Sequence, residues 1–126
     1  MNQKQTLQIA SILGVLAVGI GAFGAHVFKP ALISMGRLET YELAVRYQFY
    51  HALALLMVGI LMKQYNSPKL SYASLFFVVG TVFFSGSLYM LCFTGINKLG
   101  AITPIGGVFF ILGWAFIFFG VKENKL

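Results

Sequence analysis

The chain has 126 residues, of which 59% are hydrophobic and only 10% are charged, and its formal net charge is +6. A folded chain of this length buries only about two-thirds of its unfolded surface, so a water-soluble fold could not cover this much apolar surface. The nine Lys and Arg residues are scattered singly between apolar runs, which argues against the basic stripe of a nucleic-acid-binding protein.

Four apolar stretches predict an all-α protein in which four transmembrane helices form a compact antiparallel bundle in a single membrane domain. Each stretch has about the 20 residues that a helix needs to cross about 30 Å of hydrocarbon. The connections between them carry most of the charge and the turn-forming residues, as loops do. The predicted transmembrane helices are Leu7–Phe28, Glu42–Met62, Ser71–Phe93 and Ala101–Val121.

The first span presents small residues on one side, with Ala17, Gly21 and Ala25 four residues apart. Small residues let membrane helices approach closely, so we interpret this side as a packing surface within the bundle, with a dimer interface as the alternative.

The first span ends at His26 after Ala22-Phe23-Gly24-Ala25, which resembles a signal-peptide cleavage site. We do not expect cleavage, because the apolar run is too long for a typical signal peptide and three more spans follow.

The entry into the second span is the most polar part of the chain. Four residues at steps of three or four share one side of the predicted helix, and these are Glu39, Glu42, Arg46 and Tyr50. Tyr47 and His51 form a neighbouring pair on the same helix. Since a charge in hydrocarbon costs about 2.5–3.5 kcal/mol, Arg46 should extend toward the interface or pair with Glu42. His51 lies about 13 Å deeper than Glu42, so its ring needs a partner inside the protein.

The later spans contribute fewer polar groups. Ser85 and Tyr89 lie late in the third span, and Thr103 and Pro104 begin the fourth. A proline in the first turn is most simply a helix start, although a broken helix end that lines a ligand site is the alternative. Trp114 lies well inside the fourth span, so its indole N–H needs a partner on another helix.

The sequence favours no cofactor, no metal and no enzyme. Antiparallel packing would bring His26 to the membrane side of Glu39 and Glu42. Two histidines with carboxylates could bind a metal, and two facing histidines could bind haem. No pair has a diagnostic spacing, so we expect hydrogen-bonded structural histidines instead. The lone Cys92 cannot form an internal disulfide. No Ser/His/Asp set or phosphate-binding glycine loop emerges.

The distribution of Lys and Arg predicts the orientation. With four spans, both termini share a membrane side with the connection 63–70. That side carries Lys4, Lys63, Lys69, Lys122 and Lys125, whereas the other side carries Lys29, Arg37 and Lys98. Because cytoplasmic loops are enriched in basic residues, we expect a plasma-membrane protein with both termini in the cytoplasm and the polar entry of the second span in the extracytoplasmic half.

Four sequence blocks, spread nearly end to end, resemble the YwdK/YgdD-like family of small multi-pass membrane proteins. The blocks are Gly21–His26, Tyr47–Ala54, Ser85–Tyr89, and Ile102–Gly107 followed by Gly113-Trp114. The resemblance implies a multi-pass plasma-membrane protein and supplies no catalytic residue. On the predicted topology, these blocks begin or end their spans in the same half of the membrane.

These observations predict a non-enzymatic accessory, lipid-interacting or small-ligand-interacting bundle, whose polar cluster either holds the helices together or receives the ligand. The alternatives are a transporter or channel subunit with the same residues along a polar pathway, and a haem- or quinone-associated factor. The expected partners are the lipid bilayer and a second copy or another membrane protein, and not nucleic acid. The candidate binding residues are His26, Glu39, Glu42, Arg46, Tyr47, Gln48, Tyr50, His51, Ser85, Tyr89 and Thr103.

Overall fold

The computed structural model describes residues 1–122, which are helical apart from short connections. The α-helices are α1 (Gln3–His26), α2 (Lys29–Ser34), α3 (Leu38–Gln64), α4 (Pro68–Thr81), α5 (Ser87–Thr94) and α6 (Thr103–Lys122). A π-helix, η1 (Val82–Gly86), joins α4 to α5 in one continuous rod, and a 3-10 helix, η2 (Asn97–Ala101), precedes α6. Lys125, which contributes to the predicted charge bias, lies outside the described residues.

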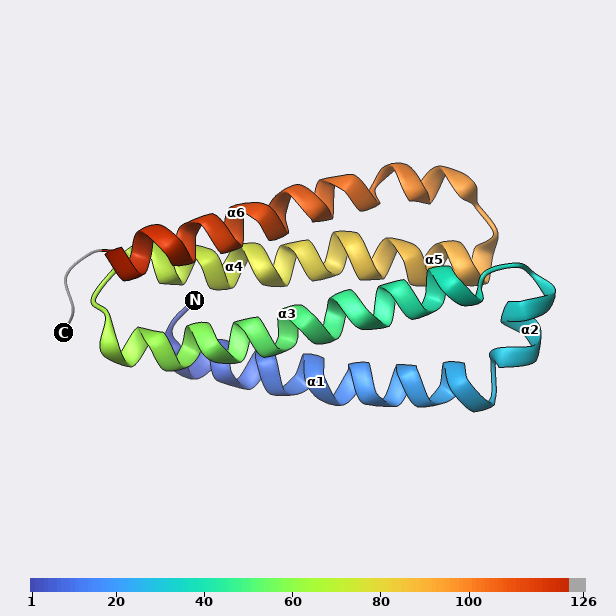
Figure 1. The fold of residues 1–126 in the computed structure, drawn as a ribbon, viewed down its shortest axis with the longest axis horizontal. Helices are drawn as coiled ribbons and strands as arrows, with labels where there is room; N and C mark the ends of the chain where they lie inside the picture. The colour runs from blue at the N-terminus through green and yellow to red at the C-terminus, as the bar shows by residue number, and fades with distance from the viewer. Residues whose placement is uncertain (123–126) are drawn as a thin grey trace.

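Four helical segments are long and apolar enough to cross a membrane, and these are Gln3–His26, Leu38–Gln64, Pro68–Thr94 and Asn97–Lys122. They lie side by side and alternate in direction (Figure 1), which confirms the predicted all-α antiparallel bundle. With 24 to 27 residues each, these segments are about 36–40 Å long at about 1.5 Å per residue. Since the hydrocarbon layer is about 30 Å thick, the helix ends reach the lipid headgroups.

The helices are arranged as a row in which α3 and the α4–α5 rod are central. α1 packs along α3, α3 packs against α4, and α6 packs along α4. In the most apolar window of each span, 39% of α3 and 44% of the α4–α5 rod is buried, against 17% for each of the two outer spans. The outer helices therefore expose most of their surface, which in a bilayer faces lipid.

Three helices begin earlier than their apolar patterns indicate, and α4 does so at Pro68 instead of Ser71. α1 begins directly after Asn2, whose side chain forms a capping box with Gln5. α3 begins at Leu38, one turn before the predicted start at Glu42, and the expected connection 29–41 also contains α2. The charged entry of the second span is therefore part of one continuous helix.

Glycines mark the places where helices approach most closely. A Cβ at Gly113 of α6 would lie 2.5 Å from Cε1 of Phe77, and a Cβ at Gly106 would collide with the backbone nitrogen of Phe84 in η1. No neighbouring atom lies within 4 Å of the Cβ position at Gly14. Gly106 and Gly113 of α6 thus serve packing within the bundle, whereas α1 remains open at Gly14.

Candidate functional site

His51 is buried at the middle of α3, and both of its ring nitrogens have hydrogen-bond partners. Nε1 of Trp114 donates to Nε2 of His51 over 3.2 Å, and Nδ1 of His51 lies 2.8 Å from the backbone oxygen of Tyr47. Because an indole N–H only donates and a carbonyl only accepts, this network assigns a neutral ring with its proton on Nδ1. The ring also stacks on Phe110, with centroids 3.5 Å apart and planes 6° apart. His51 and Trp114 thus provide the internal partners that each needs.

A second buried contact joins three helices near the charged end of α3. Nε2 of Gln48 donates to the backbone oxygen of Leu13 on α1 over 3.0 Å. Its Oε1 accepts from the hydroxyl of Tyr89 on α5 over 2.7 Å. Gln48 therefore ties α1 and the α4–α5 rod to α3 at a depth where water is scarce.

Two serines anchor the π-helix region to its neighbours. Oγ of Ser85 lies 2.7 Å from the backbone oxygen of Ala44 on α3, and Oγ of Ser87 lies 2.7 Å from Oγ1 of Thr103 at the start of α6. The sequence singled out Ser85 and missed Ser87, although both belong to the same Ser-Gly-Ser block. A π turn holds an additional residue and rotates the side chains that follow it, so Ser87 is the one that meets Thr103.

The buried polar network is complete within itself. Every buried side-chain nitrogen or oxygen in residues 1–122 has a hydrogen-bond partner. Five of the candidate residues belong to this network through their side chains, and these are Gln48, His51, Ser85, Tyr89 and Thr103. Tyr47 joins it through its backbone oxygen. These contacts knit the bundle together and leave its interior without an unpaired polar group over the described range.

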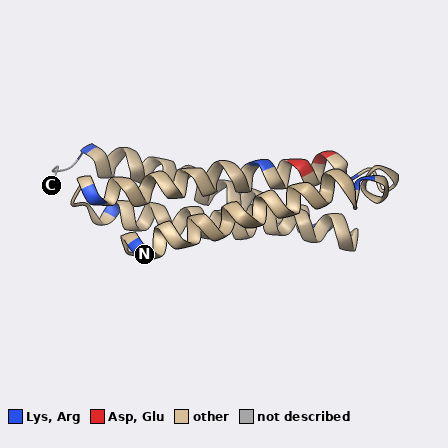
Figure 2. Ribbon diagram, turned by 90° about the horizontal axis from the view of Figure 1, so that it is seen from below, with Lys and Arg blue, Asp and Glu red and all other residues tan. Residues whose placement is uncertain are grey.

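The remaining candidates are exposed on the outside of the bundle, and these are His26, Glu39, Glu42, Arg46 and Tyr50. As expected, the charged residues of α3 lie on one side of the helix. Figure 2 shows the acidic and basic positions one after another along it. Within the described part of the chain, the side chains of Glu39, Glu42 and Arg46 form no ion pair. Of the two arrangements expected for Arg46, the pairing with Glu42 is therefore not present.

The structure does not assemble the considered cluster of two histidines and carboxylates. His26 is the last residue of α1 and is exposed, whereas His51 is buried halfway along α3. Among residues 1–122, no group of three or more His, Cys, Asp and Glu side chains could hold a metal ion.

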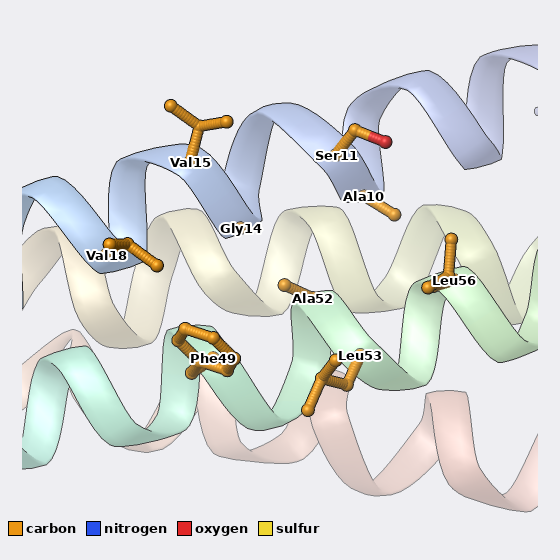
Figure 3. A pocket seen from close by; sticks show the side chains of 9 residues that line it. All are labelled: Ala10, Ser11, Gly14, Val15, Val18, Phe49, Ala52, Leu53 and Leu56. Atoms are coloured by element: carbon orange, nitrogen blue, oxygen red, sulfur yellow. The ribbon is translucent and has the colours of Figure 1, made fainter.

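Two open hollows follow one another along the seam between α1 and α3, since their lining residues continue at steps of three and four on both helices, and together they define a groove. This groove has a hollow of about 250 Å³ beside Glu42 and Arg46 and an apolar hollow of about 440 Å³ farther along the seam (Figure 3). From α3 it is lined by Glu42, Val45, Arg46, Phe49, Leu53 and Leu56. From α1 it is lined by Ala25, Gly21, Val18, Val15, Gly14 and Ser11. We call this surface the α1–α3 groove.

Side-chain size explains why the groove is open. At one end of the seam, Tyr41 packs on Gly24 and donates from its hydroxyl to the backbone oxygen of Ile20. Farther along, Gly14 of α1 and Ala52 of α3 present almost no side chain to each other (Figure 3). The hollow between the helices therefore opens onto the lipid-facing side. In the sequence, only the small residues of α1 indicated such a hollow.

The fold and these surfaces define a small polytopic membrane protein with a closed polar core and a charged, grooved outer face. Residues 20–107 match a family described as a protein of unknown function, DUF423. The chain belongs to this family of small membrane proteins, as the resemblance of its sequence blocks predicts.

Several relatives match almost the whole chain. A UPF0382 membrane protein of Staphylococcus saprophyticus is 46% identical over 93% of this chain and 96% of its own length. The UPF0382 inner membrane protein YgdD of Escherichia coli K12 is 38% identical over 99% of this chain and 95% of its own length. A UPF0382 membrane protein of Staphylococcus aureus is 45% identical over 88% of this chain and 89% of its own length. No solved structure matches.

Proposed function

We propose that this protein is a non-enzymatic accessory component of the plasma membrane that binds a lipid or another small amphipathic ligand in the α1–α3 groove. One observation carries the proposal. Glu42 and Arg46 line the end of the groove, and Glu39 lines a neighbouring hollow on α3 together with them. All three are exposed and form no ion pair among the described residues. A molecule with a charged head and an apolar tail would satisfy both parts of this surface at once.

The position of these charges relative to the membrane supports the proposal. α3 is about 40 Å long, so its first turns reach the headgroup layer while the groove continues into the hydrocarbon. Side chains on a helix lean toward its N-terminus, so Arg46 extends toward the same layer. Without a partner at that depth, a charge facing lipid is costly. On the expected orientation, this is the extracytoplasmic leaflet.

The alternative functions, a polar transport pathway and a haem or metal site, would need side chains that already form hydrogen bonds inside the bundle. A polar pathway through the bundle would recruit Gln48 and His51, whose hydrogen-bonding groups are bonded to Leu13, Tyr89 and Trp114. Haem or metal ligation by His51 would require a free ring nitrogen, and both nitrogens are engaged. These contacts favour a structural role for the core and leave the outer face for ligand binding.

Filling the groove tests the proposal. Gly14 lines the apolar part and has open space at its Cβ position, so Gly14→Leu should fill the groove without disturbing the bundle. Gly19 of the same helix is equally open and lies outside the lining, so Gly19→Leu is the matched control. Native mass spectrometry of protein released from native-lipid nanodiscs should detect a retained lipid or other small amphiphile in the wild type and in Gly19→Leu, with strong loss in Gly14→Leu.

Two results would contradict the proposal. One is a wild-type protein that retains no lipid or other small amphiphile above the background of an unrelated four-helix membrane protein. The other is equal retention by the two leucine variants. Thermal unfolding of both variants checks that the comparison concerns the groove and not the stability of the bundle.

A further inference from the structure

The charge order along α3 points to a specific chemical class of ligand for the α1–α3 groove. We infer that the groove binds a phospholipid with a primary ammonium group, with its phosphate at Arg46, its ammonium group at Glu42 and Glu39, and an acyl chain in the apolar part. This inference rests on the proposed function and names the ligand class for the same site.

The depth of each charge matches the layout of such a headgroup. Arg46 lies about 6 Å deeper along α3 than Glu42 and about 10 Å deeper than Glu39. In a phospholipid, the phosphate is next to the glycerol and the acyl chains, and the ammonium group is farther out. The order of these positions along α3, with the basic residue deeper and the two acidic residues farther out, is therefore the order of the anionic and cationic groups in the headgroup.

The apolar part of the groove continues from these charges along the same helix sides. On α3, Arg46, Phe49 and Leu53 follow at steps of three and four residues, which keeps them on one side of the helix. On α1, which runs in the opposite direction, Gly21, Val18 and Gly14 do the same. A chain attached to a phosphate at Arg46 thus enters the hollow between the helices directly.

Charge and hydrogen bonding select among phospholipids. The three residues Glu39, Glu42 and Arg46 sum to one negative charge, so a headgroup with an anionic group alone meets two unfavourable carboxylates. A quaternary ammonium group balances the charge but cannot donate hydrogen bonds. A primary ammonium group has three donors, as the Lys ammonium has, and charge-assisted hydrogen bonds to carboxylates are about twice as strong as neutral ones.

The first experiment measures lipid preference. Wild-type protein is placed in nanodiscs with equal amounts of phosphatidylethanolamine, phosphatidylglycerol and phosphatidylcholine, and the lipids it retains on release are measured by native mass spectrometry. We expect phosphatidylethanolamine to be enriched over both competitors. Arg46→Gln and Glu42→Gln should each reduce that enrichment on the order of tenfold, which corresponds to about 1.4 kcal/mol. Lys98→Gln removes a charge from η2, outside the groove, and should leave the enrichment unchanged.

A charge exchange separates this inference from self-association. In a parallel dimer, Glu42 of one copy could pair with Arg46 of the other, and the double variant Glu42→Arg/Arg46→Glu would keep that reciprocal pair. The same exchange reverses the charge order that the lipid encounters. We therefore expect the double variant to lose its preference for phosphatidylethanolamine, and the mass spectrum reports the oligomeric state at the same time.

The possible failures are distinguishable. Retention of phosphatidylglycerol or phosphatidylcholine as strongly as phosphatidylethanolamine would overturn the inference while the proposed lipid-binding function stands. A dimer that persists in the exchanged variant and retains no lipid would overturn it in favour of a second copy as the occupant. Absence of any retained lipid in the wild type would remove the proposed function itself.

Discussion

At the residue scale, His51 and Trp114 explain each other's presence in the middle of a membrane bundle. Each side chain has a polar group that hydrocarbon cannot satisfy. The indole N–H of Trp114 donates to Nε2 of His51, and Nδ1 of His51 reaches the backbone oxygen of Tyr47. Packing and hydrogen bonding therefore account for a histidine at this depth.

Replacing His51 tests this structural role. His51→Leu would leave the indole N–H of Trp114 without its acceptor and remove the ring stacked on Phe110. We expect the free energy of unfolding, measured in mixed micelles, to fall by about 1–3 kcal/mol. Trp114→Phe removes the donor itself and should cost less. Unchanged stability of His51→Leu together with a lost cellular activity would contradict a structural role.

At the scale of elements, the π-helix η1 determines how the third span meets the fourth. It rotates the following turn so that Ser87 reaches Thr103, while Ser85 turns to the backbone of α3. Gly106 of α6 lies directly against the backbone of η1 at Phe84. The close approach of η1 and α6 therefore requires a glycine at position 106, because any side chain there would push the two helices apart.

Adjacent glycines of α6 provide a matched pair for this contact. Gly106→Ala should destabilise the bundle by about 1–3 kcal/mol, because its Cβ would overlap the backbone of η1. Gly107→Ala meets no atom within 4 Å and should be neutral or stabilising by up to about 1 kcal/mol, since alanine is the better helix former. Unfolding of both variants in mixed micelles provides the comparison. Equal stabilities would show that η1 and α6 do not approach this closely.

At the scale of the whole molecule, the bundle is an open row, and this shape creates its outer face. α1 packs mainly on α3 and has no helix on its other side. The seam between α1 and α3 is therefore open to lipid. The charged entry of α3 and the apolar groove lie on this seam. The polar groups of the core are bonded inside the bundle, so the exposed charges are the part of the molecule best placed to meet a partner in the membrane.

The orientation of the bundle can be tested with single cysteines after Cys92→Ala. Asn66→Cys lies in the connection between α3 and α4, and Ser34→Cys lies at the end of α2, at the opposite end of the bundle. Because the basic residues favour the first of these ends as cytoplasmic, a membrane-impermeant maleimide should label Ser34→Cys on intact cells. It should label Asn66→Cys only after permeabilisation. The reverse pattern would invert the orientation and place the groove's charges in the cytoplasmic leaflet.

The sequence alone determined the number of spans, the fold class and the polar side of α3. Spanning a membrane requires a run of about 20 apolar residues, and helical spacing places Glu42 and Arg46 on one side, so both are local properties. The same reasoning required internal partners for His51 and Trp114.

The tertiary structure decided which groups meet. Gln48 could have found any hydroxyl at its depth, and only the rotation of the α4–α5 rod brings Tyr89 to it. No pattern indicated the π turn, after which Ser87 meets Thr103 while Ser85 bonds to the backbone of α3. The groove between α1 and α3 and the unpaired state of Glu42 depend on how two helices pack, because neither helix by itself specifies the space left between them.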